Sequence, residues 1–280
     1  MQTKATLLFL FICSISFAQK HTSLKKYSSK ELYSDFDFMV NALKEAHAGL
    51  YWYQSVATFD SICAQERAKI KDGMHSYDFF RIASKIVTAT KEGHCRIGSS
   101  KDIGEYFNEK ALIPPIIVKV LDKKVYILND IEHYNIKGKI LTKINNTSID
   151  SIIKVLFSYS PRCADGFIKT GKLRYTIDYS GLAYYYTDYF TNTSTYTLEL
   201  LNTKNHQTET IRVKGASSKA FSVIENAITH PEFQQPIDLK IDTNKKIAQL
   251  SIHSFRHTYY DKDGNEDKAF NIFTGKIDSV

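Results

Sequence analysis

The residue in this chain of 280 that is best suited to chemistry is a histidine in the run Lys91-Glu92-Gly93-His94-Cys95. An imidazole can take a proton from a hydroxyl and return it to a leaving amine near neutral pH, so His94 is a candidate general base. The competing interpretation is a surface or packed histidine without a catalytic role. Cys95 is not expected to be its nucleophile, because neighbours on an extended chain point to opposite faces.

A serine nucleophile to partner His94 is not found. Acyl transfer needs an exposed serine on a tight turn and backbone N–H donors that form an oxyanion hole, and neighbouring glycines permit that approach. The sequence contains no two adjacent glycines and no Gly-x-Ser-x-Gly. The pair Ser99-Ser100 after Gly98 is the nearest approximation, and we interpret it as a loop. No catalytic serine is assigned, and whether the chain is an enzyme stays open.

Two further groups have metal-binding residue types but unsuitable spacing. His253 and His257 would share one face of a strand about 13 Å apart, with no third ligand nearby. The loop Asp261–Asp267 carries carboxylates, but its glycine stands at position four and not six of a calcium loop. We therefore predict no metal and no cofactor, and a solvated turn at Asp261.

The first residues have the pattern of a secretory leader. Lys4 precedes the apolar run at residues 7–12, and Ser16-Phe17-Ala18 supplies small residues before Gln19. A lipoprotein alternative would use Cys13, but Ile12 is bulky where a small residue is expected. We predict a signal peptide over 1–18 and export to the periplasm or the extracellular space. No other apolar run approaches the ~20 residues of a membrane span.

The remaining cysteines do not settle a disulfide framework. Cys63, Cys95 and Cys163 are an odd number without a CxxC spacing, so their pairing stays open. Three buried thiols are the simpler interpretation. The net charge of +7 is spread thinly along the chain, which argues against a nucleic-acid partner.

The elements that would position these residues fall into three stretches. Residues 25–110 are expected to be helical: Ser28 and Glu31 form a capping box before an apolar stripe, Thr58 can cap a second helix, and Ser76 a third. Residues 111–215 change to β-rich runs. Hairpins are expected around 122–124 and 202–205, with a strand within 138–145 and a short helix at 149–157. The tyrosine-rich stretch 175–190 shows little periodicity.

The last stretch, 240–280, begins with a strand at 247–252 and continues to a helix within 268–277. One strand and part of one helix cannot bury both of their faces, so this stretch either packs on the preceding domain or is the edge of something larger. Truncation is the simpler expectation, because Phe270, Ile272, Phe273 and Ile277 offer an apolar face with nothing after them to cover it.

Four segments together resemble the tail-specific (C-terminal-processing) serine peptidases, in their secreted tricorn-core-like branch. Glu45–Tyr53 is similar to a His-Pro-Gly-Leu-Tyr motif, with Ala48 in place of proline. Residues 91–95 resemble an Asp-Gly-His-Thr element, with Glu92 and Cys95 as departures. Residues 138–145 resemble the Gly-Asp-x-Ile-Leu-x-Ile-Asn run of a PDZ-like domain, with Lys139 in place of aspartate. Residues 247–255 look like the strand that opens the catalytic core.

This resemblance implies an α+β protein: an N-terminal helical bundle, a PDZ-like β-rich domain that holds a peptide, and the first strand and helix of a crotonase-like α/β catalytic core. It implies His94 as general base to a serine in a later glycine-rich turn, which this sequence lacks. The expected partner is a polypeptide substrate or a peptide ligand.

Two alternatives use the same sequence differently. A non-catalytic exported protein could bind peptides by adding them as a strand to a sheet edge of the PDZ-like domain. A structural or carbohydrate-associated exported protein could use its tyrosines as a binding face, although core and hairpin packing explains such residues more often than not: Tyr175, Tyr179, Tyr184, Tyr185, Tyr186 and Tyr189.

Overall fold

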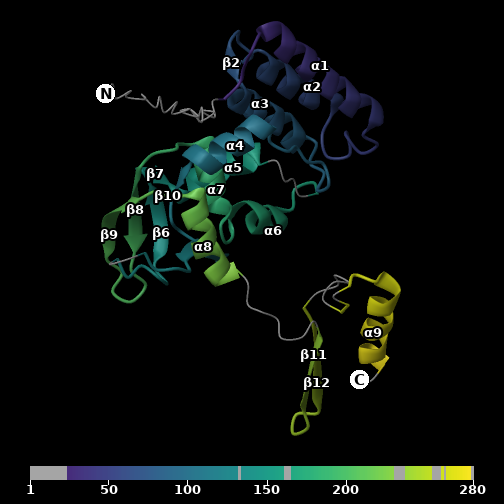
Figure 1. Ribbon diagram of the computed structural model, residues 1–280, viewed down its shortest axis with the longest axis vertical. Helices are drawn as coiled ribbons and strands as arrows, with labels where there is room; N and C mark the ends of the chain where they lie inside the picture. Colours follow the sequence, from purple (N-terminus) through teal and green to yellow (C-terminus); the bar gives the residue numbers. More distant parts are fainter. Residues whose placement is uncertain are drawn as a thin grey trace, which may run out of the picture. The chain divides into compact units, whose positions relative to one another are not determined.

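The computed structural model describes residues 24–131, 134–160, 165–229, 237–253, 260–261 and 263–278 (Figure 1). These residues combine helices with several small sheets, which confirms the mixed α and β class. Two compact units are formed, one within Met1–Ala227 and the other within Ile228–Val280. The leader segment 1–18, Cys163 and His257 lie outside the described residues, so the predictions made for them stay predictions.

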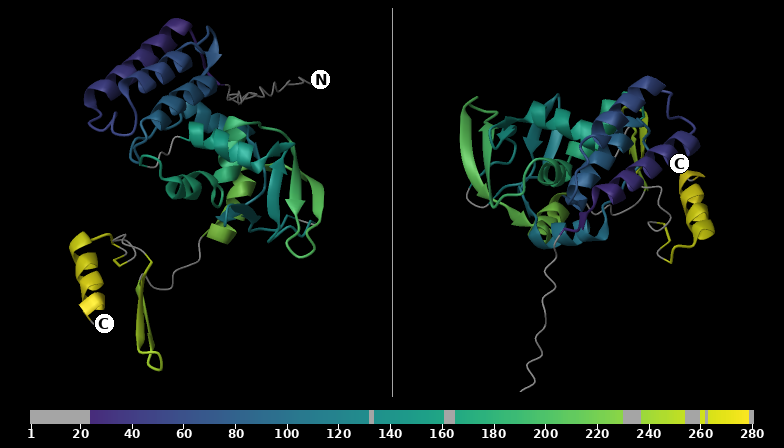
Figure 2. Two further views of the ribbon diagram at one scale, coloured as in Figure 1. Left: turned by 180° about the vertical axis from the view of Figure 1, so that it is seen from behind. Right: turned by 90° about the horizontal axis from the view of Figure 1, so that it is seen from above.

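Three helices pack side by side in the N-terminal part of the first unit (Figures 1 and 2). They are α1 (Ser29–Ala46), α2 (Val56–Arg67) and α3 (Ser76–Ala89). Their facing stripes bury a common core that includes Leu32, Phe36, Phe59 and Ile86. Burial of each such side chain stabilises the fold by about 1.5–3 kcal/mol before entropy is subtracted. A two-stranded sheet of β1 (Lys26–Tyr27) and β2 (Met74–His75) ties the entry of α1 to the entry of α3.

The helix starts follow the sequence signals in one case and depart from them in two. The capping box before α1 is confirmed: Glu31 N–H donates to Ser28 Oγ, and Ser28 N–H donates to Glu31 Oε2 at 2.9 Å. The predicted cap of the second helix at Thr58 is wrong, because Ser55 accepts the Thr58 N–H at 3.1 Å and starts α2 three residues earlier. Ser76 is the first residue of α3 and not its cap.

A six-stranded antiparallel sheet forms the second part of this unit, in the order β4-β5-β6-β8-β9 with β7 (Thr147–Ser148) beside β6. The strands on the main path are β4 (Val118–Leu121), β5 (Lys124–Ile127), β6 (Ile140–Ile144), β8 (Thr195–Leu201) and β9 (Thr208–Lys214). Both predicted hairpins are confirmed. In the first, Asp122 and Lys123 have φ angles of 47° and 63°, as a two-residue hairpin turn requires.

The two outer strands of this sheet differ. Val118 N–H donates to Tyr179 O at 3.0 Å and Val120 N–H donates to Asp178 Oδ1 at 2.8 Å, so the chain itself covers the edge of β4. The opposite edge is β9, whose Thr210 and Arg212 are exposed. The Arg212 carbonyl oxygen accepts a 2.6 Å bond from the Tyr134 hydroxyl.

Helices connect and cover the strands. The predicted helix after β7 is confirmed as α5 (Ile149–Tyr159), which contacts β6 and α3. The aperiodic tyrosine-rich stretch is explained by a change of helix type: α6 (Lys169–Lys172) leads into a π-helical turn, Leu173–Ile177, and then α7 (Gly181–Tyr189). In a π-helical turn each backbone hydrogen bond spans five residues, so the apolar face of the helix shifts there. No single helical period therefore fits the apolar residues of the whole stretch.

The remaining elements of this unit are short. They are α4 (Lys101–Lys110), α8 (Ser218–Thr229) and a two-stranded sheet of β3 (Leu112–Ile113) with β10 (Ala216–Ser217). None of the helices in the described part of the chain is both long and apolar enough to cross a membrane.

The second unit contains a hairpin and a helix. The predicted strand is confirmed as β12 (Ile247–Ile252), and it pairs antiparallel with β11 (Ile237–Asp242). The predicted helix is α9 (Glu266–Asp278). Ile241, Ile247 and Phe270 are exposed here, whereas Phe273 contacts Tyr260 edge to face.

Candidate functional site

The two N-terminal motif segments, 45–53 and 91–95, meet in the structure. The Lys91 ammonium donates to the Tyr53 carbonyl oxygen at 3.1 Å, and the Gln54 amide donates to the Ala89 carbonyl oxygen at 2.5 Å. The loop after α1 is therefore fastened to the end of α3. These hydrogen bonds place the turn that carries His94 beside the loop that follows α1.

A third segment, 165–168, contacts both of these motif segments. It is not among the site residues predicted from the sequence. Asp165 Oδ1 accepts the Gly93 N–H at 2.7 Å, and Gly166 N–H donates to the Lys91 carbonyl oxygen at 2.8 Å. The Gly166 φ of +58° and its contact with the Tyr53 ring leave no space for a side chain. The signal that could have identified this turn is the Asp165-Gly166 dipeptide itself.

His94 lies on a turn at the surface, with its side chain 89 % exposed. Its Nδ1 lies 3.0 Å from Glu92 Oε1, and its backbone N–H donates to the same oxygen at 2.8 Å. Burial opposes the ionisation of Glu92, but these hydrogen bonds from His94 outweigh it and hold the pKa of that carboxyl below its ordinary value. An ionised Glu92 accepts a hydrogen bond from Nδ1–H, which leaves Nε2 as the basic atom of the ring.

The hydroxyl and thiol groups of Ser100 and Cys95 in the same loop, and of Cys63 on α2, have other roles. Ser100 precedes α4, and its hydroxyl donates to Asp102 Oδ1 at 2.5 Å, consistent with the loop interpretation. Cys63 and Cys95 are both free thiols. Burial raises the pKa of both, to about 11 in Cys63, so neither is an activated nucleophile.

The candidate calcium loop is closed by its own chain. Asp261 accepts the Asn265 N–H at 3.0 Å and pairs with the Lys268 ammonium at 2.6 Å. Within the described ranges, no group of three histidine, cysteine or acidic side chains could hold a metal ion.

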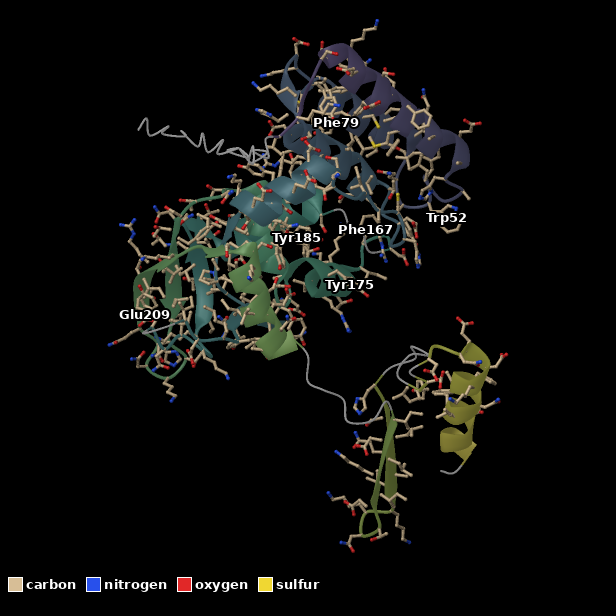
Figure 3. The ribbon with its side chains drawn as sticks, in the orientation of Figure 1. Trp52, Phe79, Phe167, Tyr175, Tyr185 and Glu209 are labelled. Carbon is tan, nitrogen blue, oxygen red and sulfur yellow. The ribbon has the colours of Figure 1, made fainter. Side chains whose placement is uncertain are left out.

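The six tyrosines of the proposed binding face separate into two sets. Tyr184 packs against Phe221 with ring centroids 5.0 Å apart, and Tyr186 is buried and stacked on Phe190. Tyr175 and Tyr179 are the exposed members, and Figure 3 labels Tyr175 and the partly buried Tyr185. Packing therefore accounts for much of this set.

No family model and no curated protein matches the chain.

Proposed function

We propose that this chain supplies the general base and a peptide-holding framework of a tail-specific serine peptidase, and that it cleaves no peptide bond alone. The observation that carries the proposal is the Glu92–His94 pair on a turn fixed by Lys91. A base oriented by a carboxylate supplies two of the three members of a hydrolytic triad. The resemblance of the four segments supplies the reaction class.

The nucleophile and the oxyanion hole, which the sequence does not show, define the first test. Without a nucleophile and an oxyanion hole, most of the rate enhancement of a hydrolase is lost. Purified chain incubated with an unstructured polypeptide should yield no fragments by mass spectrometry. Cleavage that a serine-directed inhibitor abolishes would contradict the proposal that the chain is inactive alone.

The base itself can be tested in the chain as it stands. Long-range ¹H–¹⁵N spectra at about pH 8 should show His94 with its proton on Nδ1, because Glu92 accepts there. Glu92→Gln should redistribute the proton between the two ring nitrogens, whereas Glu105→Gln on the surface of α4 should not. If the His94 signals are unchanged in Glu92→Gln, Glu92 does not orient His94, and the proposal loses the observation on which it rests.

A longer gene product gives the decisive activity test. If codons after Val280 encode a glycine-rich serine turn, the longer protein should cleave unstructured polypeptides and His94→Gln should abolish cleavage. Retained activity in His94→Gln would refute the role of His94 as base.

A second function is favoured by the β9 edge, where Thr210 and Arg212 are exposed, although the Arg212 carbonyl oxygen already accepts a hydrogen bond from the Tyr134 hydroxyl. An extended peptide can add to such an edge through backbone hydrogen bonds. Titration with an unstructured polypeptide should then shift the amide signals of Thr210 and Arg212, with no cleavage. Shifts elsewhere only would contradict strand addition at β9.

The proposal also includes export from the cytoplasm, which the leader pattern in residues 1–18 supports. Intact mass of exported protein should correspond to a start at Gln19. A mass that retains residues 1–18 would refute the leader.

A further inference from the structure

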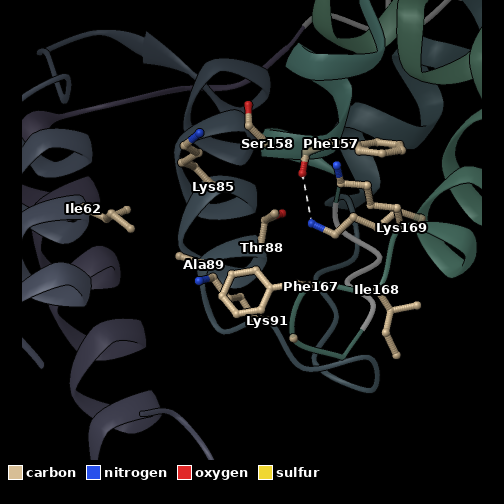
Figure 4. Close-up of a pocket in the computed structure, with 12 residues that line it drawn as sticks. Ile62, Lys85, Thr88, Ala89, Lys91, Phe157, Ser158, Phe167, Ile168 and Lys169 are labelled. Atoms are coloured by element: carbon tan, nitrogen blue, oxygen red, sulfur yellow. Dashed lines mark hydrogen bonds between the residues drawn. The ribbon is translucent and has the colours of Figure 1, made fainter. Parts of the chain in front are cut away.

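A pocket of about 280 Å³ lies between α3, α5 and the segment 166–172 (Figure 4). Its apolar lining comes from these three walls and from α2: Ile62 on α2, Ala89 on α3, Phe157 on α5, and Phe167 and Ile168 on the segment 166–172. The volume is close to the lower end for small-molecule sites, about 300 Å³. It suits a ligand with a single ring or a short alkyl group.

Four lysines also line this pocket, and none of its lining residues in the described part of the chain is acidic. Lys85 projects from α3, Lys91 follows that helix, and Lys169 and Lys172 come from α6. The Lys172 ammonium donates to the Phe157 carbonyl oxygen at 3.2 Å, drawn as the dashed line in Figure 4. The Lys85 ammonium lies 4.7 Å from the centroid of the Tyr159 ring.

Two carboxylates lie near the pocket: Glu66, whose charge acts on Lys85, and Asp165, which precedes the lining residue Gly166. Glu66 pairs with Lys69 at 2.7 Å, and Asp165 accepts the Gly93 N–H. Burial lowers the pKa of Lys85; Glu66 opposes this effect, while the charges of Lys69 and Lys172 add to it. Cations thus outnumber anions around the pocket, and a bound anion would relieve their mutual repulsion.

The aromatic wall is held in place before any ligand arrives. Phe167 is 75 % exposed, an unusual position for a phenylalanine, yet its ring contacts the Tyr53 ring edge to face. The Lys91 ammonium lies 4.3 Å from the centroid of the Phe167 ring (Figure 4). Gly166 fixes the turn that presents it. A preorganised wall lowers the entropic cost of binding.

We propose that this pocket binds a small ligand in which one anionic group, a carboxylate or a phosphate, is joined to an aromatic or apolar group. The lysines neutralise the anion, and Phe157, Phe167 and Ile168 cover the apolar part. The site does not depend on the function of His94, so it stands or fails separately from the proposed peptidase role.

Titration of the full chain with phenyl phosphate and with phenylacetate, followed by amide chemical shifts, tests the site. We expect saturable shifts at Thr88, Ser158 and Gly166 below ~10 mM, the weak affinity usual for ligands of this size. Benzyl alcohol, which lacks the charge, and inorganic phosphate, which lacks the ring, should each bind at least about tenfold more weakly. Equal binding of either control, or no saturation by both probes, would overturn the proposal.

Lysine variants test which ammonium groups bind the anionic part of the ligand. Lys85→Met and Lys169→Met should each weaken binding of the better probe by about tenfold, the effect of one lost ion pair in a partly buried site. Lys204→Met, in the turn between β8 and β9, is the matched control and should leave affinity unchanged. Lys169 is exposed, so its variant stays informative if Lys85→Met fails to fold. Unchanged affinity in Lys169→Met would refute the proposed site.

Discussion

The hydroxyl of Tyr77 donates a hydrogen bond to the carboxyl of Asp188, 111 residues further along the chain. Tyr77 stands in the first turn of α3 and Asp188 near the end of α7, so this bond joins the helical part of the first unit to the tyrosine-rich part. Arg81 reinforces the junction, because its Nε donates to the Asp188 carbonyl oxygen at 2.8 Å.

Asp188 should make stability fall as pH rises from about 4 to about 6. Burial raises its pKa to about 6, only partly offset by the Tyr77 hydrogen bond and the charge of Arg81. The folded state therefore binds this proton more tightly than the unfolded chain. The stabilisation is complete below the ordinary pKa near 4 and is lost as pH passes about 6, on the order of 3 kcal/mol.

Asp188→Asn keeps an acceptor for Tyr77 and stays neutral, so it should be more stable than the parent at about pH 7.5 and lack this slope. Urea unfolding across the pH range measures both effects. Asp35→Asn, at an exposed position on α1, is the control and should retain the slope. If the unfolding free energy of Asp188→Asn falls with pH as steeply as that of the parent, Asp188 is not the group responsible.

Asp102 should have the opposite pH dependence. Its carboxylate accepts hydrogen bonds from Ser100 Oγ and Ser76 Oγ, both at 2.5 Å, and from Lys25 N–H at 3.0 Å. Burial opposes ionisation, but these bonds prevail and lower its pKa to about 2. The stabilisation is present above the ordinary pKa near 4 and is lost as pH falls towards about 2.

Asp102→Asn replaces a charged acceptor by a neutral one and should cost about 1–2 kcal/mol at neutral pH. Its loss should shrink as pH is lowered towards about 2, which urea unfolding of both proteins would show. A loss that does not depend on pH would indicate a packing effect in place of the proposed charge.

Gly166→Ala should destabilise the turn that joins the His94 loop to Tyr53. An added Cβ would lie 2.8 Å from the Tyr53 ring, in a backbone conformation with φ +58°. We expect a loss of about 1–2 kcal/mol in thermal or urea unfolding. Gly98→Ala is the control, because nothing lies within 4 Å of its added Cβ and its φ is not positive. Equal effects of the two substitutions would contradict the turn's proposed role.

Cys63 should resist alkylation in the folded protein. It is 7 % exposed, and burial raises the pKa of its thiol to about 11, so little thiolate forms at about pH 8. Iodoacetamide labelling, mapped by peptide mass spectrometry, should modify Cys63 more slowly than the less buried Cys95. Denaturant should remove the difference. Faster labelling of Cys63 in the native state would be inconsistent with its burial.

Signals that act over a few residues were readable in the sequence. The Ser28–Glu31 capping box, both hairpin turns and the helix after β7 depend on hydrogen bonds between near neighbours and on local apolar patterns. For the same reason, the strand at 247–252 was predicted correctly while its partner β11 was not anticipated. The start of α2 was predicted wrongly at Thr58, because serine and threonine can both cap a helix and the structure uses Ser55.

The sequence by itself determined that the protein mixes α and β elements and that His94 lies beside a carboxylate two residues away. Only the tertiary structure decided what surrounds that pair. Hydrogen bonds join Lys91 to Tyr53, Gly93 to Asp165 and Ser76 to Asp102, and the partners are 26 to 72 residues apart in the sequence. No local pattern encodes such pairs, because they form only when packing of the apolar faces has brought distant segments together.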